Sequence, residues 1–327
     1  MTTTAPATGP TLPLRLAFGT PRKLPKPQRL EGRVAVVDIA FASEGGGRRN
    51  GFERTTMKFI EGLGDRLAAW VDHHDSRFHL RFADDARFTL STKAEHGACP
   101  EMVTPAVVAA AGPVDTVVCH TDFDGLASAA KWMLGGEPPY PACDDDARAI
   151  DTRVGAATEV GVLCDRALRA RPRDAEVMGD VVSLLVGRLG RGPADVRWRR
   201  LAEAGAELLA REEEAQRLAA GYARLHDDLV MVDVSRAERP YDRTKLLLLG
   251  QSQAKMAAVI DGENVTFAAP FDSGVDFLAR FGLSGGMPTL VSIHKPRLAT
   301  ALRRLGVSSE AIRTLVGPRS RREPNDG

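Results

Sequence analysis

Short apolar runs alternate with helical patterns through the first half of the chain, and this alternation predicts its fold. Three runs consist almost entirely of small or branched apolar residues, as buried strands of a parallel sheet do: Val34–Val37, Ala68–Val71 and Thr116–Cys119. Helical periodicity lies between and after them, as at 55–67 and 126–134. Strands separated by helices in this way indicate βαβ units and a doubly wound, mainly parallel α/β sheet.

The pattern becomes helical from about 155 to 228. Within 194–229, apolar side chains recur every seven residues and form one stripe along a long helix: Leu201, Leu208, Ala215 and Tyr222, with Leu218 and Leu225 beside them. Such a stripe is typical of a helix that packs on a core or connects two domains. It could serve equally as the contact surface of a homodimer.

The last third of the chain predicts a smaller α+β domain. The expected elements are strands at 229–232 and 289–293, a helix at 275–281, and a hairpin formed by 255–260 and 265–269. Asp261-Gly262, between the two arms of the hairpin, is a strong turn signal.

Four segments follow from these patterns. Residues 1–30 and 317–327 are rich in proline, basic and polar residues, which predicts disordered tails. Between them we expect a larger α/β domain at 31–228, including the helical connector, and the smaller domain at 229–316.

Composition narrows the class of protein only modestly. Lys and Arg number 44 and Asp and Glu 43 in 327 residues, so any basic groove for nucleic acid must be local. The cysteines form no Cys-x-x-Cys pair, no run reaches about 18 apolar residues, and the N-terminus lacks a secretion signal. These features predict a reduced, cytoplasmic protein without disulfides or a membrane span.

Each of the three predicted strands leads into side chains that bind metals. Asp38 ends the first, Asp72-His73-His74 the second, and His120-Thr121-Asp122-Phe123-Asp124-Gly125 follows the third. Ligands collect at the carboxyl ends of strands in such sheets. Asp38 alone could be a helix cap, and Asp-x-Asp-Gly alone a solvated turn. Their joint occurrence at three strand ends favours a shared metal cluster.

The types of ligand indicate the ion. Carboxylates and imidazoles without a thiolate favour Mn²⁺, with Mg²⁺ or Co²⁺ as alternatives, over structural zinc. So many ligands exceed the needs of one ion and predict two divalent ions about 3.5–4 Å apart. Such centres catalyse in-line displacement at phosphorus, which makes the chain a candidate metal-dependent phosphoesterase.

These motifs resemble those of the DHH phosphoesterases. Asp72-His73-His74 matches the motif that names the family, and Val36-Val37-Asp38 resembles its second motif. The segment 120–125 resembles the first motif, in the form found in the oligoribonuclease (nanoRNase-like) branch. The resemblance covers most of 31–151 and implies a phosphoesterase domain followed by a smaller substrate-binding domain.

The resemblance also implies roles for these residues. The metal ligands would be His120 and Asp122 on one ion, Asp124 and His73 on the other, and Asp38 bridging the two. The catalytic residues would be Asp72, which orients His73, and His74, which faces the scissile phosphate.

The order of the motifs departs from that of the family. Here the lone Asp and Asp-His-His precede His-x-Asp-x-Asp-Gly, so the sheet is predicted to be circularly permuted, which leaves the strand ends in place. The permutation obscures the fourth motif of the family, a further metal-binding Asp. Asp151 resembles it best, with Asp144, Asp145 and Asp146 as competitors.

Two further segments are candidate substrate-binding sites. Arg48 and Arg49, in a glycine-rich loop after Asp38, could bind phosphates bidentately or belong to an ordinary surface loop. Ser284-Gly285-Gly286 resembles the glycine-rich run with which family members bind nucleotides, although Met287 stands nearby instead of a His, and a plain turn is the alternative.

The predicted function is that of a two-metal-ion phosphoesterase acting on phosphodiester bonds of short oligonucleotides or small nucleotides. Within the same class, the alternatives are a cyclic-dinucleotide phosphodiesterase and a pyro- or polyphosphatase. Outside it, the alternative is a non-catalytic nucleotide-binding regulator, which would bind nucleotide without turnover.

Overall fold

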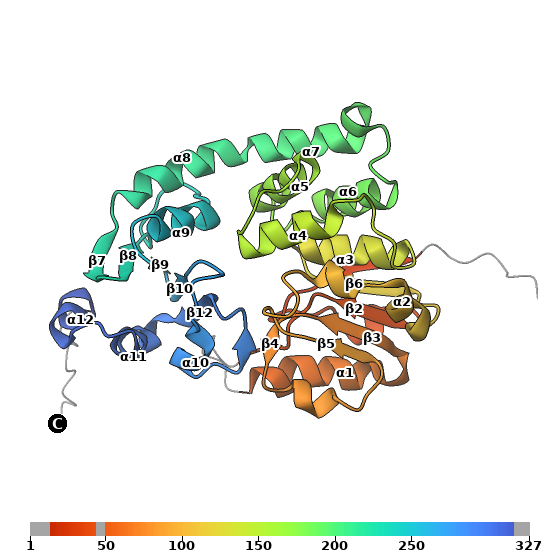
Figure 1. The fold of residues 1–327 in the computed structure, drawn as a ribbon, viewed down its shortest axis with the longest axis horizontal. Helices are drawn as coiled ribbons and strands as arrows, with labels where there is room; N and C mark the ends of the chain where they lie inside the picture. The colour runs from red at the N-terminus through yellow and green to blue at the C-terminus, as the bar shows by residue number, and fades with distance from the viewer. Residues whose placement is uncertain (1–13, 44–49, 317–327) are drawn as a thin grey trace, which may run out of the picture.

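A five-stranded parallel sheet forms the centre of the first half of the protein (Figure 1). The computed structural model describes residues 14–43 and 50–316. In spatial order, the strands are β1 (Arg15–Phe18), β6 (Thr116–Cys119), β2 (Val34–Val37), β3 (Leu67–Asp72) and β5 (Phe88–Leu90). Val37 pairs with Cys119 on one side and Val71 on the other, so three strands end at one edge. The predicted α/β class is confirmed.

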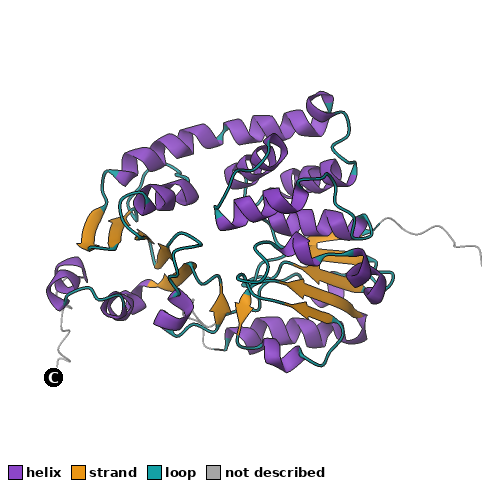
Figure 2. Ribbon diagram, in the orientation of Figure 1, coloured by secondary structure: helices purple, strands orange, loops and turns teal. Residues whose placement is uncertain are grey.

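Helices cover both faces of this sheet (Figure 2). Ala35 and Val37 face a core shared with α3 to α7, whereas Val34 and Val36 face a second core with α1. The helices are α1 (Lys58–Leu63, after a π-helical segment Phe52–Met57), α2 (Pro105–Ala111), α3 (Phe123–Met133), α4 (Cys143–Thr152), α5 (Glu159–Ala170), α6 (Ala175–Val186) and α7 (Val196–Ala206). Burial on both faces explains why the strands are apolar throughout.

β1 corrects the predicted N-terminal tail. The prediction of disorder over 1–30 is wrong for residues 14–30, which contain this edge strand, while residues 1–13 lie outside the described residues. Leu16 and Phe18 pack against the main core, and β1 pairs in parallel with β6. The prolines of this segment follow the strand and do not interrupt it, so composition alone was misleading.

Two consecutive helices replace the single long helix predicted within 194–229 (Figure 1). α7 ends at Ala206, and α8 (Leu208–Ala219) begins after a turn. The apolar stripe packs against other parts of the same chain: Leu201 lies in the core of the first sheet and Ala215 in a core of the second. The two helices therefore connect the two sheets.

The last third of the chain forms a separate, mixed sheet. In spatial order, its strands are β12 (Leu290–His294), β10 (Asn264–Ala268), β9 (Met256–Asp261), β8 (Leu229–Asp233) and β7 (Ala223–His226). β9 and β10 form the predicted hairpin, with Gly262 at a φ of 56° in its turn. Because β7 pairs with β8, this sheet begins before the predicted boundary at 229.

Helices also lie on both faces of the second sheet. α9 (Arg243–Gln251) packs with α8 on one face, and the other face carries α10 (Phe277–Phe281), α11 (Leu298–Arg304) and α12 (Ser309–Val316). The predicted tail 317–327 lies outside the described residues.

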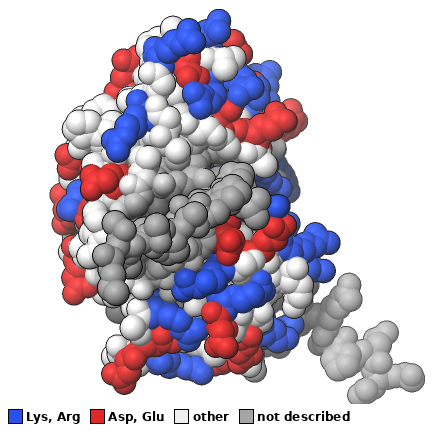
Figure 3. Space-filling view, turned by 90° about the vertical axis from the view of Figure 1, so that its right-hand side faces the viewer, with Lys and Arg blue, Asp and Glu red and all other residues white. Residues whose placement is uncertain are grey.

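The distribution of charged side chains and the state of the cysteines can be compared with what the composition predicts. Basic and acidic side chains are interspersed on the face shown in Figure 3. All four cysteines are buried and free. Within 14–43 and 50–316, no helix combines the length and apolarity that crossing a bilayer requires.

Candidate metal centre

Three neighbouring strands bring the predicted ligands together. β2 lies between β6 and β3, so Asp38, directly after β2, is flanked by His120 on one side and His73 on the other. Asp38 Oδ1 lies 3.2 Å from His73 Nε2, and Asp38 Oδ2 lies 3.7 Å from His120 Nδ1. One carboxylate oxygen is thus directed toward each imidazole, which places Asp38 between two potential cation positions.

Asp38 is held in a backbone conformation that few residues adopt. Its φ of 57° lies in the left-handed region, which costs about 1–3 kcal/mol for such a residue. Its N–H donates to the Val71 carbonyl oxygen at 2.9 Å, which fixes this conformation. The side chain is buried, and neither carboxylate oxygen has a hydrogen-bond partner among the described residues. Such an arrangement is costly for stability and typical of a functional site.

The first cluster consists of Asp38, His120 and Asp122, whose ligand atoms lie within 4.8 Å of one another. His120 Nδ1 lies 2.6 Å from Asp122 Oδ2 but is not aligned for a hydrogen bond. Asp122 is the N-cap residue of α3, yet its side chain accepts no capping hydrogen bond. A Cβ on Gly125 would lie 2.8 Å from the His120 carbonyl oxygen, so glycine allows α3 to begin this close to the cluster.

The second cluster consists of His73, Asp124 and Asp151. His73 Nε2 lies 3.3 Å from Asp124 Oδ2, and Asp151 reaches the cluster from the last turn of α4. Of the four candidate aspartates, the structure brings Asp151 to the site. The other three lie elsewhere: Asp144 pairs with Lys131, Asp145 is exposed, and Asp146 accepts hydrogen bonds from Tyr140 and Thr158.

Lys93 also lies in the second cluster, and sequence reasoning missed it. Its Nζ lies 2.9 Å from His73 Nε2 and contacts Asp151 Oδ2, and its side chain is 1% exposed. In the sequence it stands in a polar turn after β5, where a lysine ordinarily points to solvent. The pairing of β5 beside β3 brings this turn to the site, and no local pattern reveals it.

The histidines of the Asp-His-His motif have different partners. His74 Nδ1 donates to Asp72 Oδ1 at 2.8 Å, whereas His73 Nδ1 donates to the His96 carbonyl oxygen at 2.9 Å. The prediction that Asp72 orients His73 is therefore wrong, because Asp72 orients His74. Residues i and i+2 of an extended segment point the same way, which explains the pairing.

An excess of negative charge dominates the electrostatics of the site. Burial, reinforced by the charges of nearby aspartates, raises the pKa of Asp38 well above its usual range. Burial lowers the pKa of His120, but the Asp122 carboxylate outweighs burial and raises this pKa to about 10. Burial and Lys93 lower the pKa of His73, yet its carboxylate neighbours raise it to about 11. A site that draws protons onto its histidines attracts metal cations for the same reason.

The contact with Lys93 decides the protonation of His73. An ammonium group only donates hydrogen bonds, so Nε2 must accept at 2.9 Å. We therefore assign the neutral tautomer with its proton on Nδ1, although the raised pKa favours the protonated ring. His74 is neutral as well, because burial and Lys93 lower its pKa.

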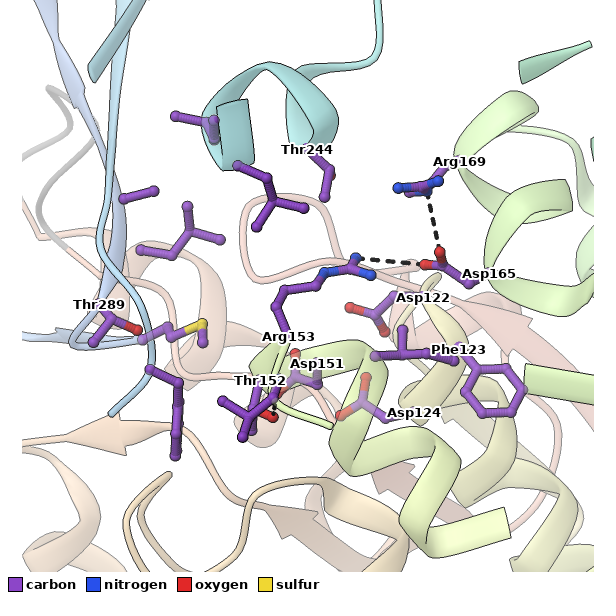
Figure 4. Close-up of a pocket in the computed structure, with 18 of the residues that line it drawn as sticks. Asp122, Phe123, Asp124, Asp151, Thr152, Arg153, Asp165, Arg169, Thr244 and Thr289 are labelled. Carbon is purple, nitrogen blue, oxygen red and sulfur yellow. Dashed lines mark hydrogen bonds and ion pairs between the residues drawn. The ribbon is translucent and has the colours of Figure 1, made fainter. Parts of the chain in front are cut away.

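A cavity of about 700 Å³ adjoins both clusters (Figure 4). Its lining includes Asp122 and Asp151 on one side and Thr244 and Thr289 from the second sheet and its helices on the other. Arg153 also lines it, paired with Asp165 at 3.4 Å. This volume is within the usual range for small-molecule sites.

Of the predicted substrate-binding residues, Ser284, Gly285 and Gly286 do not line this cavity. Arg48 and Arg49 lie outside the described residues. Gly285 and Gly286 form β11, which pairs antiparallel with β4 (Asp75–Ser76) directly after the Asp-His-His motif, and Ser284 precedes them. Substrate binding by this run stays a prediction, whereas its structural role is to join the second sheet to the metal site.

Comparisons with known proteins leave the family open. No protein-family model and no curated protein matches the chain. One similar solved structure is the pGpG-specific phosphodiesterase PggH from Vibrio cholerae, 14% identical over 49% of this chain and 66% of that one, with a TM-score of 0.32. Another is an uncharacterized protein from Helicobacter pylori G27, 12% identical over 80% of this chain and 79% of that one, with a TM-score of 0.23. At these TM-scores neither match establishes a shared fold or function.

Proposed function

We propose that the protein is a metal-dependent phosphoesterase that hydrolyses phosphodiester bonds of short oligonucleotides or small nucleotides. The observation that carries this proposal is the buried Asp38 carboxylate, without a hydrogen-bond partner, between His120 and His73. The site adjoins a cavity of a size suited to a nucleotide. Buried like charges destabilise the fold, so their concentration here supports a function for them.

The donor set fits Mn²⁺, with Mg²⁺ or Co²⁺ as alternatives. The first cluster would hold one ion through atoms that have no other partner among the described residues. The second cluster would hold the other ion of the predicted pair, provided that Lys93 leaves His73 and Asp151. A bound metal supplies Lewis acidity and lowers the pKa of a coordinated water.

Hydrolysis also requires proton transfer by the protein. A water oxygen bonds to phosphorus, the bond from phosphorus to the leaving oxygen breaks, and a proton reaches that oxygen. His74 is suited to this transfer, because Asp72 fixes its Nδ1 proton and Nε2 can exchange another. The first turn of α3 adds a partial positive charge suited to phosphate.

The remaining cavity walls are suited to the rest of a nucleotide. Arg153 and Arg243 supply positive charge, and Phe271 and Met287 supply apolar surface for a base or sugar. Arg243, Phe271 and Met287 belong to the second half of the chain, and we therefore infer that this half contributes to substrate selection.

A substrate panel tests the proposal. Purified protein with Mn²⁺ is incubated with labelled di- to pentanucleotides, a cyclic dinucleotide, pyrophosphate and polyphosphate. We expect hydrolysis of the oligonucleotides that is lost in Asp38→Asn and kept in Asp85→Asn, a carboxylate that pairs with Arg87 outside both clusters. Turnover confined to another substrate would assign one of the narrower alternatives. Nucleotide binding without turnover of any substrate would overturn the enzyme and favour the regulator.

A further inference from the structure

Lys93 stands where a second metal ion would bind. Its Nζ lies 2.9 Å from His73 Nε2 and contacts Asp151 Oδ2, so it touches two of the three residues of the second cluster. The Nε2 atom of a neutral imidazole has one lone pair, so it cannot accept from an ammonium and coordinate a metal at once. The second cluster can therefore hold Lys93 or an ion, but not both.

Hydrogen bonds of the loop that carries Lys93 hold this residue at the second cluster. The Lys93 backbone N–H donates to Asp75 Oδ2 at 3.2 Å, and Glu95 accepts hydrogen bonds from Ser91 at 2.7 Å and Thr92 at 3.0 Å. The same loop supplies the His96 carbonyl oxygen to His73 Nδ1. Both ring nitrogens of His73 are thus bound by one loop.

The two clusters differ in how many of their polar atoms have a hydrogen-bond partner. In the first, both Asp38 oxygens, His120 Nδ1 and Asp122 Oδ1 have no hydrogen-bond partner among the described residues. In the second, His73 and Asp151 have Lys93 as their partner. A buried ammonium is stable only when it is paired, and this cluster of carboxylates provides the pairing. Among the described residues, the first cluster therefore keeps coordinating atoms without a hydrogen-bond partner, whereas the Lys93 ammonium occupies those of His73 and Asp151 in the second.

We propose that Lys93 replaces the second metal ion, so that the protein binds one divalent ion per chain, at Asp38, His120 and Asp122. This inference rests on the proposed function only in placing a metal at the first cluster. It revises the two-ion centre expected from the sequence to one ion and one lysine.

Counting bound Mn²⁺ tests this without reference to turnover. Equilibrium dialysis followed by elemental analysis should give one ion per chain for the wild type and for Lys93→Arg, and two for Lys93→Met. Electron paramagnetic resonance should change from the spectrum of an isolated ion to that of a coupled pair in Lys93→Met, because the two ions would lie about 3.5–4 Å apart. The matched control is Lys131→Met, since Lys131 is a buried lysine paired with Asp144 outside both clusters; it should keep one ion.

Each outcome decides the proposal. Two ions in the wild type, or one ion in folded Lys93→Met, would overturn it. If Lys93→Met does not fold, the counts for the wild type and Lys93→Arg decide it, with one supporting and two or none overturning it. One bound Mn²⁺ without hydrolysis would contradict the phosphoesterase and leave the role of Lys93 intact, whereas hydrolysis with two bound ions would do the reverse.

Discussion

The Nδ1 atom of His74 lies 2.8 Å from Oδ1 of Asp72, a carboxylate that belongs to neither metal cluster. This hydrogen bond fixes the proton position and the ring orientation of His74. The two histidines of the motif thus have different partners: His73 lies against Asp124 and Lys93, whereas His74 is held by Asp72 and lies 3.9 Å from Asp38.

We therefore expect Asp72→Asn to lower kcat about 10–100-fold while leaving Mn²⁺ binding nearly unchanged. The amide removes the charge that favours the Nδ1-protonated tautomer of His74 but touches no residue of the first cluster. Steady-state kinetics and equilibrium dialysis measure the two effects separately. An equal loss of metal binding would show that Asp72 supports the metal site and does not act through His74 alone.

Asp38→Asn should stabilise the metal-free protein and abolish the stabilisation that metal gives. The raised pKa of Asp38 means that its charged form disfavours the folded state at neutral pH, so the metal-free variant should be more stable, by about 1–3 kcal/mol. The wild type should gain about 2.7 kcal/mol at a Mn²⁺ concentration 100 times Kd, and the variant should not. Thermal unfolding with and without Mn²⁺ measures both, and a variant that keeps the gain would contradict a metal at Asp38.

Mn²⁺ affinity should rise with pH. The pKa of His120 is about 10 in the protein without metal, and metal binding requires the neutral imidazole, so a proton must leave. We expect about a tenfold rise in affinity per pH unit for each proton released, from about pH 6.5 to 9. Calorimetry in buffers of different ionisation enthalpy counts the protons. An affinity independent of pH would show that His120 is not a ligand.

The stability of the metal-free protein should show the opposite trend. Since the folded pKa of His120, about 10, exceeds its ordinary value of about 6.5, its contribution is complete below about pH 6.5 and is lost as pH rises toward 10. Urea unfolding at several pH values should show this decline in the wild type and a smaller one in His120→Gln. Equal declines in the two proteins would contradict the assigned shift.

Gly285→Ala should separate β11 from β4. A Cβ at this position would lie 2.5 Å from the Asp75 carbonyl oxygen, which the paired backbone cannot accommodate. We expect a loss of about 1–3 kcal/mol in the free energy of unfolding. Gly179→Ala, on α6 with open space around its Cβ position, is the control and should be neutral or stabilising. Equal behaviour of both variants would mean that the β4–β11 pairing tolerates a side chain.

The strand ends could be predicted from the sequence because a buried parallel strand has a recognisable apolar run. Since parallel strands run in the same direction, their carboxyl ends lie at the same edge of the sheet. Asp38, His73 and His120 meet for this reason. Asp151 could be proposed only by resemblance, since a single Asp on a helix carries no pattern of its own.

Other features depend on contacts between distant segments. Lys93 reaches His73 because β5 pairs with β3, and the Asp72–His74 pairing follows from side-chain direction after β3 ends. β1 was missed because prolines nearby suggested disorder, although Leu16 and Phe18 supply the apolar alternation of an edge strand.

The two halves of the chain are joined through the connector α7–α8 (Figure 1), through the ion pair between Arg169 on α5 and Asp242 before α9, and through the β4–β11 pairing beside the metal site. Two halves joined on one side of a cavity can move apart to admit a larger ligand, whereas halves joined on both sides cannot. Moving these halves apart would break the hydrogen bonds between Asp75–Ser76 and Gly285–Gly286. The width of the cavity should therefore stay constant. Under the proposed function, it would admit the free end of a short oligonucleotide and exclude the interior of a long one.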